Sequence, residues 1–248
     1  MMFRRVCVVA GILLFNLGMS SSGYAADKIG EVVAAVGEPQ AKGQDGTRTL
    51  SAGSDVFEND SIIVATGNAQ IQLRDGTRLV VGPGSNLLLD RFVMRGGNKA
   101  QKISIMALRG TYRFITGKSD KSAYNIATSS ATIGIRGTGF DFWVKKKTGA
   151  VVLRGAVVLR GLNGGSVNVN SGCQMGEATT TSARPLVGAE KAKTIRENLP
   201  FLLDQSQLNR RFRLDVTACR LQGPDEQGSG EQPSSPPPNN RTRGNNGP

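Results

Sequence analysis

The chain has 248 residues and a formal net charge of +12, and it contains no histidine. Histidine is the commonest general base and the commonest metal ligand in proteins, so the composition counts against an enzyme that depends on either role. We therefore predict a protein that is not an enzyme and that has no cofactor and no metal site. The length fits one domain or two small ones.

Residues 1–25 have the pattern of a cleaved signal peptide. Arg4 and Arg5 precede an apolar run, Val6–Met19, which is shorter than the roughly 20 residues that a membrane-spanning helix needs. Gly23 and Ala25 occupy the two small-residue positions before the expected cut. The sequence thus predicts a periplasmic or otherwise extracytoplasmic protein. An uncleaved anchor is the alternative.

From residue 28 to residue 172 the pattern is strand, turn, strand. Its clearest unit is the hairpin Ala69–Arg74, Asp75-Gly76, Thr77–Val81, in which Asp-Gly is expected to supply the positive φ angles of a two-residue loop. We expect the last strand at Val167–Val169. Short strands at this spacing predict an all-β domain, either a two-sheet sandwich of jelly-roll type or a short β-solenoid.

Residues 186–221 have a different character and predict a helical extension. One helix is expected at Ala189–Asn198 and a second at Pro200–Leu214, with Phe201, Leu208 and Phe212 on its apolar side. The second helix either packs on the β domain or presents its basic end to an acidic partner. Residues 222–248 lack aliphatic and aromatic side chains and predict a disordered tail.

Cys173 and Cys219 would remain after cleavage, in an oxidising compartment. Two cysteines in such a compartment favour a disulfide, provided that both sulfurs can meet. The alternative is a pair of buried, unlinked thiols.

Several stretches in residues 28–172 resemble the FecR domain family. The most specific are Ile126-Ala127-Thr128 and the run from Ile133 to Thr138, which match the family's "ATP…GVRGT" signature except that Ser129 stands in place of proline. Asp75-Gly76-Thr77 is similar to the family's turn before an apolar strand. The resemblance implies an extracytoplasmic all-β domain in which these signature residues are structural: Asp75, Gly76, Thr77, Ala127, Thr128, Arg136, Gly137 and Thr138.

The family's namesake is a membrane-spanning regulator that relays a signal from an outer-membrane receptor to a cytoplasmic sigma factor. Only five residues precede the apolar run of this chain, so we do not expect the relay role to carry over.

Two charged motifs have both functional and structural interpretations. Arg136 is either part of an exposed recognition loop or an internal partner of Asp141. The run Lys145-Lys146-Lys147, with Lys118 and Lys121, is either a basic contact face or a solvated hairpin tip.

Three functions remain open at this point. The leading hypothesis is an envelope binding or sensing module for a protein partner or an anionic cell-wall polymer. The alternative is a structural or assembly accessory of the envelope. An enzyme would need two carboxylates facing across a cleft, with Asp75, Asp90 and Asp141 as the candidates. Nucleic acid is not expected as a partner, because the protein is predicted to be exported. The oligomeric state stays open.

Overall fold

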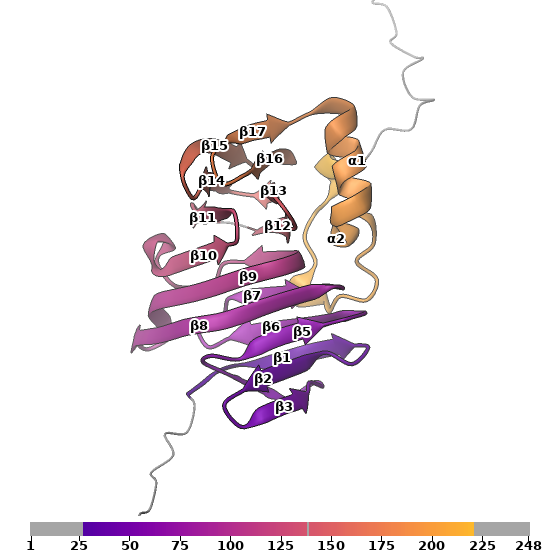
Figure 1. Ribbon diagram of the computed structural model, residues 1–248. Helices are drawn as coiled ribbons and strands as arrows, with labels where there is room; N and C mark the ends of the chain where they lie inside the picture. The colour runs from indigo at the N-terminus through magenta and orange to yellow at the C-terminus, as the bar shows by residue number, and fades with distance from the viewer. Residues whose placement is uncertain (1–26, 138, 221–248) are drawn as a thin grey trace, which may run out of the picture.

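The computed structural model describes residues 27–137 and 139–220, and strands dominate them (Figure 1). The strands are β1 (Lys28–Val36), β2 (Gln40–Gly43), β3 (Gly46–Thr49), β4 (Asp55–Phe57), β5 (Ser61–Val64), β6 (Asn68–Leu73), β7 (Arg78–Val81), β8 (Ser85–Gly96), β9 (Lys99–Ile115), β10 (Tyr124–Thr128), β11 (Ala131–Ile135), β12 (Gly139–Val144), β13 (Thr148–Arg154), β14 (Ala156–Gly161), β15 (Gly164–Asn170), β16 (Gln174–Ala178) and β17 (Ala183–Leu186). The helices are α1 (Gly188–Asn198) and α2 (Pro200–Leu203), with short 3₁₀ turns at Lys121–Ala123, Arg210–Phe212 and Thr217–Cys219. The all-β prediction is confirmed.

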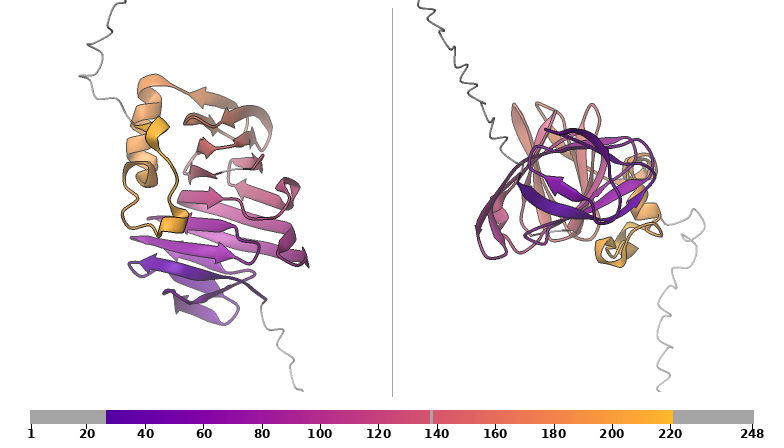
Figure 2. Two further views of the ribbon diagram at one scale, coloured as in Figure 1. Left: turned by 180° about the vertical axis from the view of Figure 1, so that it is seen from behind. Right: turned by 90° about the horizontal axis from the view of Figure 1, so that it is seen from below.

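The strands form two layers that share one long strand. In sheet A the order is β4-β1-β6-β7-β9-β12-β13-β16-β17. In sheet B it is β3-β2-β5-β8-β9-β10-β11-β14-β15. Successive hairpins alternate between the layers while the chain advances along one axis, so a two-sheet sandwich is built in solenoid-like order (Figures 1 and 2).

Strand β9 crosses from sheet B to sheet A at Gly110. This residue has φ +111°, and a Cβ added there would lie 2.1 Å from the Ser85 hydroxyl, so glycine is needed for both conformation and space. The main core fills the gap between the layers. Tyr112 and Phe114 of β9 point into it and meet Phe142 and Phe140, with ring centroids 4.7 Å and 5.5 Å apart.

Two details of the β region differ from the sequence prediction. Strands β16 and β17 follow the expected last strand, because backbone pairing of β16 with β13 and of β17 with β16 holds segments of low strand propensity in the sheet. The β6–β7 connection is a turn closed by the Gly76 N–H donating to the Leu73 carbonyl, and only Gly76 has positive φ. It is therefore not the two-residue loop that Asp-Gly predicts.

The predicted first helix is confirmed by α1, but the second helix ends at Leu203 rather than Leu214. Asp204 accepts hydrogen bonds from the Ser206 amide and hydroxyl at 2.7 and 2.9 Å, and this local turn competes with helix continuation. The chain then runs extended across the outside of sheet A (Figure 2).

The predicted signal peptide and the predicted tail lie outside the described residues. Within 27–137 and 139–220, no helix has the length and apolar character needed to cross a membrane.

Candidate functional site

Residues 188–219, here called the strap, cover the outer face of sheet A. Phe201, Leu208 and Phe212 of the strap pack on Val80 of β7. This contact confirms the interpretation in which the extension packs on the β domain, although the three apolar residues are not on one helix.

A buried ion pair lies beneath the strap. Arg113 of β9 and Asp141 of β12 are directly paired across the two strands, and both side chains are fully buried. The guanidinium donates to both carboxylate oxygens, from Nε to Oδ1 at 2.6 Å and from Nη2 to Oδ2 at 2.8 Å. This two-point geometry is the strongest that an arginine–carboxylate pair adopts.

The remaining donors of Arg113 hold the strap. Nη2 donates to the Phe201 carbonyl at 3.1 Å, and Nη1 donates to the Phe212 carbonyl at 3.3 Å and to the Gln205 side chain. Arg136, which one of its two interpretations pairs with Asp141, is exposed instead. That pairing is not formed, because the strand register places Arg113 beside Asp141.

A second anchor, on β6, lies beside the first. Buried Gln70 donates to the Gln207 carbonyl at 3.0 Å and accepts from the Asn209 amide at 2.7 Å. One amide side chain thus satisfies both a carbonyl and an N–H of the strap.

The far end of the strap is held by a disulfide, which confirms the predicted pairing. The sulfurs of Cys173 and Cys219 are 1.95 Å apart and the Cα atoms 5.2 Å apart. The pair lies in a small apolar cluster outside sheet A that also contains Trp143, Met175 and Ile195.

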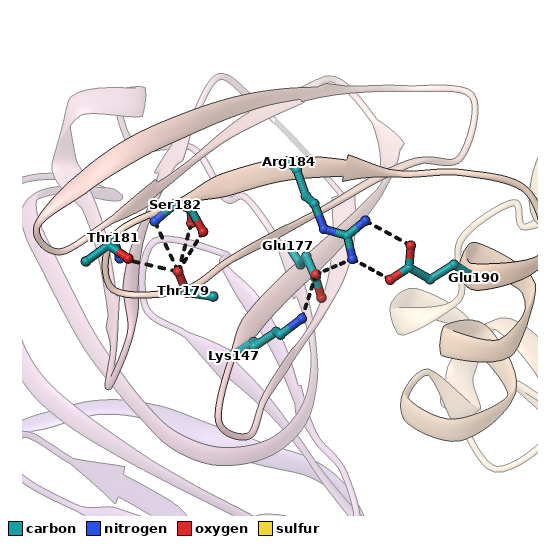
Figure 3. Close-up of polar contacts among 7 residues, drawn as sticks. All are labelled: Lys147, Glu177, Thr179, Thr181, Ser182, Arg184 and Glu190. Atoms are coloured by element: carbon teal, nitrogen blue, oxygen red, sulfur yellow. Dashed lines mark hydrogen bonds and ion pairs between the residues drawn. The ribbon is translucent and has the colours of Figure 1, made fainter.

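A chain of ion pairs connects α1 to the sandwich (Figure 3). Glu177 of β16 accepts from Lys147 at 2.8 Å and from Arg184 of β17 at 2.7 Å, and Arg184 also pairs with Glu190 of α1. The Arg184 guanidinium lowers the pKa of the Glu190 carboxyl, and the two carboxylates raise the pKa of Arg184.

A groove of about 500 Å³ opens where the strap meets the ends of the strands. The sandwich side is formed by the turns at Pro83 and Lys145 and by β9 where it crosses between the sheets at Gly110, and the strap side by the end of α1 and by α2. The apolar part of the lining includes Pro83, Trp143, Val144, Pro200 and Leu203. A smaller hollow of about 210 Å³ shares Pro83 and Pro200 with this groove and extends past Phe201 to Asp204 and Leu208.

The groove carries more positive than negative charge. Arg109, Lys145 and Arg196 line it and are exposed, against one acidic residue, Glu197. In the described part of the chain, none of these three cations has a carboxylate within ion-pair distance. Their field is free to act on a ligand.

Two polar atoms in the groove wall are buried without a partner among the described residues. They are the Thr111 hydroxyl oxygen and the Asn198 side-chain oxygen. A buried polar atom without a hydrogen bond costs about 1–3 kcal/mol, so such atoms in a native fold call for an explanation.

The structure separates the predicted basic residues into two groups. Lys145, Lys146 and Lys147 form the exposed β12–β13 turn, and the first of them lines the groove. Lys118 and Lys121 follow the end of β9, beyond Ile115, which pairs with the opposite end of β12. A strand of six residues, about 20 Å, lies between the two groups.

The first part of the family signature forms a buried hydrogen-bond cluster. Asp75 accepts from the Thr77 amide and hydroxyl at 2.9 Å each, from Ser119 at 2.7 Å and from Tyr124 at 3.0 Å. Gly76 supplies the positive φ of this turn. Burial raises the pKa of the Tyr124 phenol, and the Asp75 carboxylate adds to the shift.

The second part of the family signature lies around the β10–β11 turn. The Thr128 hydroxyl accepts from the Ala131 amide at 2.9 Å and lies 2.6 Å from the Thr148 hydroxyl. Ala127 is half-buried on β10. Gly137 has φ +81° and packs on the Lys121 side chain, and Thr138 lies outside the described residues.

The candidate carboxylates are distributed over different places. Asp75 is saturated with donors, Asp141 is covered by the strap, and Asp90 is half-buried on β8 of sheet B. In the described residues, no three His, Cys, Asp or Glu side chains form a cluster that could hold a metal.

Sequence reasoning did not find the groove. Thr111 and Asn198 come from β9 and α1, and their side-chain types carry no signal by themselves. Trp143 could have indicated part of it. By the alternation of side chains along β12, Trp143 points to the outer face of the sheet, and a large apolar residue at such a position indicates that this face is covered.

The fold and these contacts define a class of protein: a two-sheet β sandwich with a C-terminal strap fixed over one face. Residues 60–158 match the family model described as FecR protein, which confirms the resemblance found in the sequence. The matched segment runs from just before β5 into β14. The disulfide and α1 lie outside it, so the groove combines residues of the matched segment with residues beyond it.

Two solved structures are similar in part to this chain. They are crystal structures, at 2.50 Å and 1.65 Å resolution, of a protein from Parabacteroides distasonis ATCC 8503 that is provisionally described as an anti-sigma factor. The sequence identity is 14% over 54% of this chain, with TM-scores of 0.42 and 0.38. This chain spans 61% of the length of that protein. None of the curated proteins matches the sequence.

Proposed function

We propose that this chain is an exported, non-enzymatic protein of the cell envelope whose FecR domain is a binding or sensing module for a protein partner or an anionic cell-wall polymer. Export is proposed from the signal-peptide pattern of residues 1–25. The lack of histidine supports a role without catalysis.

The observation that carries the binding role is the groove beside the Lys145–Lys147 turn. One wall of the groove belongs to the sandwich and the other to the strap. Arg113, Gln70 and the Cys173–Cys219 disulfide hold the strap on the sandwich and so fix the two walls relative to each other. Because the groove is already formed, little conformational entropy is lost in ordering its walls when a ligand binds. The exposed cations at its edge favour a partner with negative charge.

In-cell crosslinking tests the proposal. A photo-crosslinking amino acid replaces Lys146, at the edge of the groove, and in a matched strain it replaces Lys118, which is equally exposed at the other end of β12. We expect a captured envelope component, identified by mass spectrometry, at position 146 and not at position 118. Equal capture at both positions, or none at 146, would refute the binding role of this face.

A salt series distinguishes the two kinds of partner within the proposal. Capture of an anionic polymer should fall steeply as the salt concentration rises, because exposed charges are screened over about 8 Å at physiological ionic strength. A protein partner held by the apolar lining should resist salt.

A further inference from the structure

The groove has a chemistry more specific than positive charge. It places exposed cations around a largely apolar floor, and its wall contains polar side-chain atoms that lack a partner in the described residues. A ligand that satisfies all three features needs negative charge, an apolar surface and several hydroxyl groups.

We propose that this groove binds an acidic carbohydrate, a short run of sugar rings bearing carboxylate or phosphate groups. The inference rests on the proposed binding function and names the ligand class for that same site. Arg109, Lys145 and Arg196 face the acidic groups, and the apolar faces of sugar rings lie on Pro83, Pro200 and Leu203. Leu203 is 55% exposed, so its side chain is accessible to such a ligand.

The polar atoms in the wall fit hydroxyl groups. Thr111 is 6% exposed and its hydroxyl has no partner among the described residues. The Asn198 side-chain oxygen is also buried without a described partner, although the residue as a whole is half-buried. A sugar hydroxyl both donates and accepts, so it can satisfy a threonine hydroxyl and an amide oxygen alike. Because both atoms are buried, contact with the ligand requires a small movement of the groove lining.

An acidic peptide fits the same charges less well. Extended peptides commonly bind by adding a strand to a free sheet edge. The strands beside the groove are β7, β9 and β12, and each of them is paired on both sides in sheet A. The groove therefore offers no edge to the main chain of a peptide.

The single tryptophan of the chain gives a direct readout, because Trp143 lines the groove. The intrinsic fluorescence of the full mature protein is titrated with four probes: an oligogalacturonate, a neutral maltooligosaccharide of equal length, a polyglutamate peptide of equal charge, and inorganic phosphate. We expect a saturable change with the oligogalacturonate and at least roughly tenfold weaker binding of the other three. Equal or tighter binding of polyglutamate, or no saturable binding of the oligogalacturonate, would overturn the inference.

Variants separate a ligand role from a structural one. Arg196→Glu should weaken binding of the oligogalacturonate by roughly tenfold or more and should reduce its salt dependence. Arg160→Glu is the matched control, because Arg160 is equally exposed but lies on β14 of sheet B. An equal loss of binding in both variants would show that only the net charge of the protein matters, and would refute the site.

Thr111→Val is the sharpest test, since it removes only the unsatisfied hydroxyl. We expect binding to weaken by roughly three- to tenfold, the range for one hydrogen bond, while the melting temperature stays the same or rises. Unchanged binding would show that this hydroxyl does not contact the ligand and would refute its part in the site.

The proposed function can be separated from the ligand class. If the oligogalacturonate fails but the crosslinker at position 146 captures a protein, the ligand class is wrong and the binding module stands. If both fail, both proposals fall.

Discussion

The two outer faces of the sandwich differ in whether a described element covers them. Sheet A directs polar side chains outward, Gln70, Arg113 and Asp141 among them, and the strap buries them together with the apolar Val80 and Trp143. On sheet B the paired residues Leu88, Met106 and Ala127 point outward, and Met106 and its neighbour Leu108 are 41% and 43% exposed. Among the described elements, the strap covers sheet A only (Figures 1 and 2).

This difference shows how a sheet holds an irregular segment. After the short helix α2 the strap has only two 3₁₀ turns, and the carbonyl and N–H groups outside them need partners once they are buried. Polar side chains on the outer face provide those partners, through Arg113 to two carbonyls and through Gln70 to one carbonyl and one N–H. A purely apolar face would leave them unsatisfied.

The largest expected effect comes from breaking the buried ion pair. Asp141→Asn leaves the Arg113 guanidinium buried without a counter-charge, which should reduce the free energy of unfolding by about 3–5 kcal/mol. Urea unfolding of the full chain measures the loss.

Asp90→Asn is the control for this substitution, because Asp90 is half-buried on sheet B, and it should change stability by about 0.5 kcal/mol or less. If Asp141→Asn were as mild as Asp90→Asn, the strap would not seal the outer face of sheet A.

The second largest effect is expected from the disulfide. Replacing both Cys173 and Cys219 by serine opens a link across a sequence separation of 46 residues, which should cost up to about 4 kcal/mol, the upper end of the usual 2–4 kcal/mol range. Hydrogen exchange should increase first in the strap and least in the core strands β9 and β12. The oxidised wild-type protein should show no free thiol under native conditions, and two reactive thiols would contradict the link.

The sequence was sufficient to predict the fold class, but not the contacts by which the strap is held on sheet A. Alternating apolar residues and Gly-rich turns predict an all-β domain because both signals are local. In the same alternating pattern, Gln70 and Arg113 occupy outward positions and resemble ordinary solvent-facing residues. The segment that covers them lies more than 80 residues further along the chain, and no residue near them in the sequence indicates it. Nearby Arg136 was one candidate partner for Asp141 for the same reason, since the sequence does not show the strand register that pairs Asp141 with Arg113.

Part of the candidate site was also within reach of the sequence. A contact face was one of the two interpretations of the Lys145–Lys147 run, the other being a solvated hairpin tip, and its first lysine lines the groove. The unsatisfied Thr111 and Asn198 could not be found, because lacking a partner is a property of packing and not of residue type.

A smaller effect is expected from acid acting on the α1 attachment. Arg184 lowers the pKa of Glu190 below its ordinary value of 4.5, so the folded state favours the charged carboxylate. This stabilisation is complete above the unfolded-state pKa and is lost as the pH falls through the lower folded-state value. Chemical shifts of α1 amides should therefore report loosening in acid.

Glu190→Gln should remove most of that pH dependence at α1, and Glu197→Gln, on the same helix, should leave it intact. Both Glu190 and Arg184 are exposed, so solvent screening keeps the effect below that of the buried pair. Equal titration of α1 in wild type and Glu190→Gln would assign the loosening to other groups.

The smallest effect on stability is expected from substitutions on the outer face of sheet B. The size of that effect decides whether this face is uncovered in solution. Met106→Gln with Leu108→Gln removes two exposed apolar side chains that point away from the core, so the free energy of unfolding should change by about 0.5 kcal/mol or less. Urea unfolding of the monomer measures it. A loss of 2 kcal/mol or more, in the range expected for buried apolar side chains, would mean that something covers sheet B as the strap covers sheet A. The contrast between a covered face and an open one would then disappear.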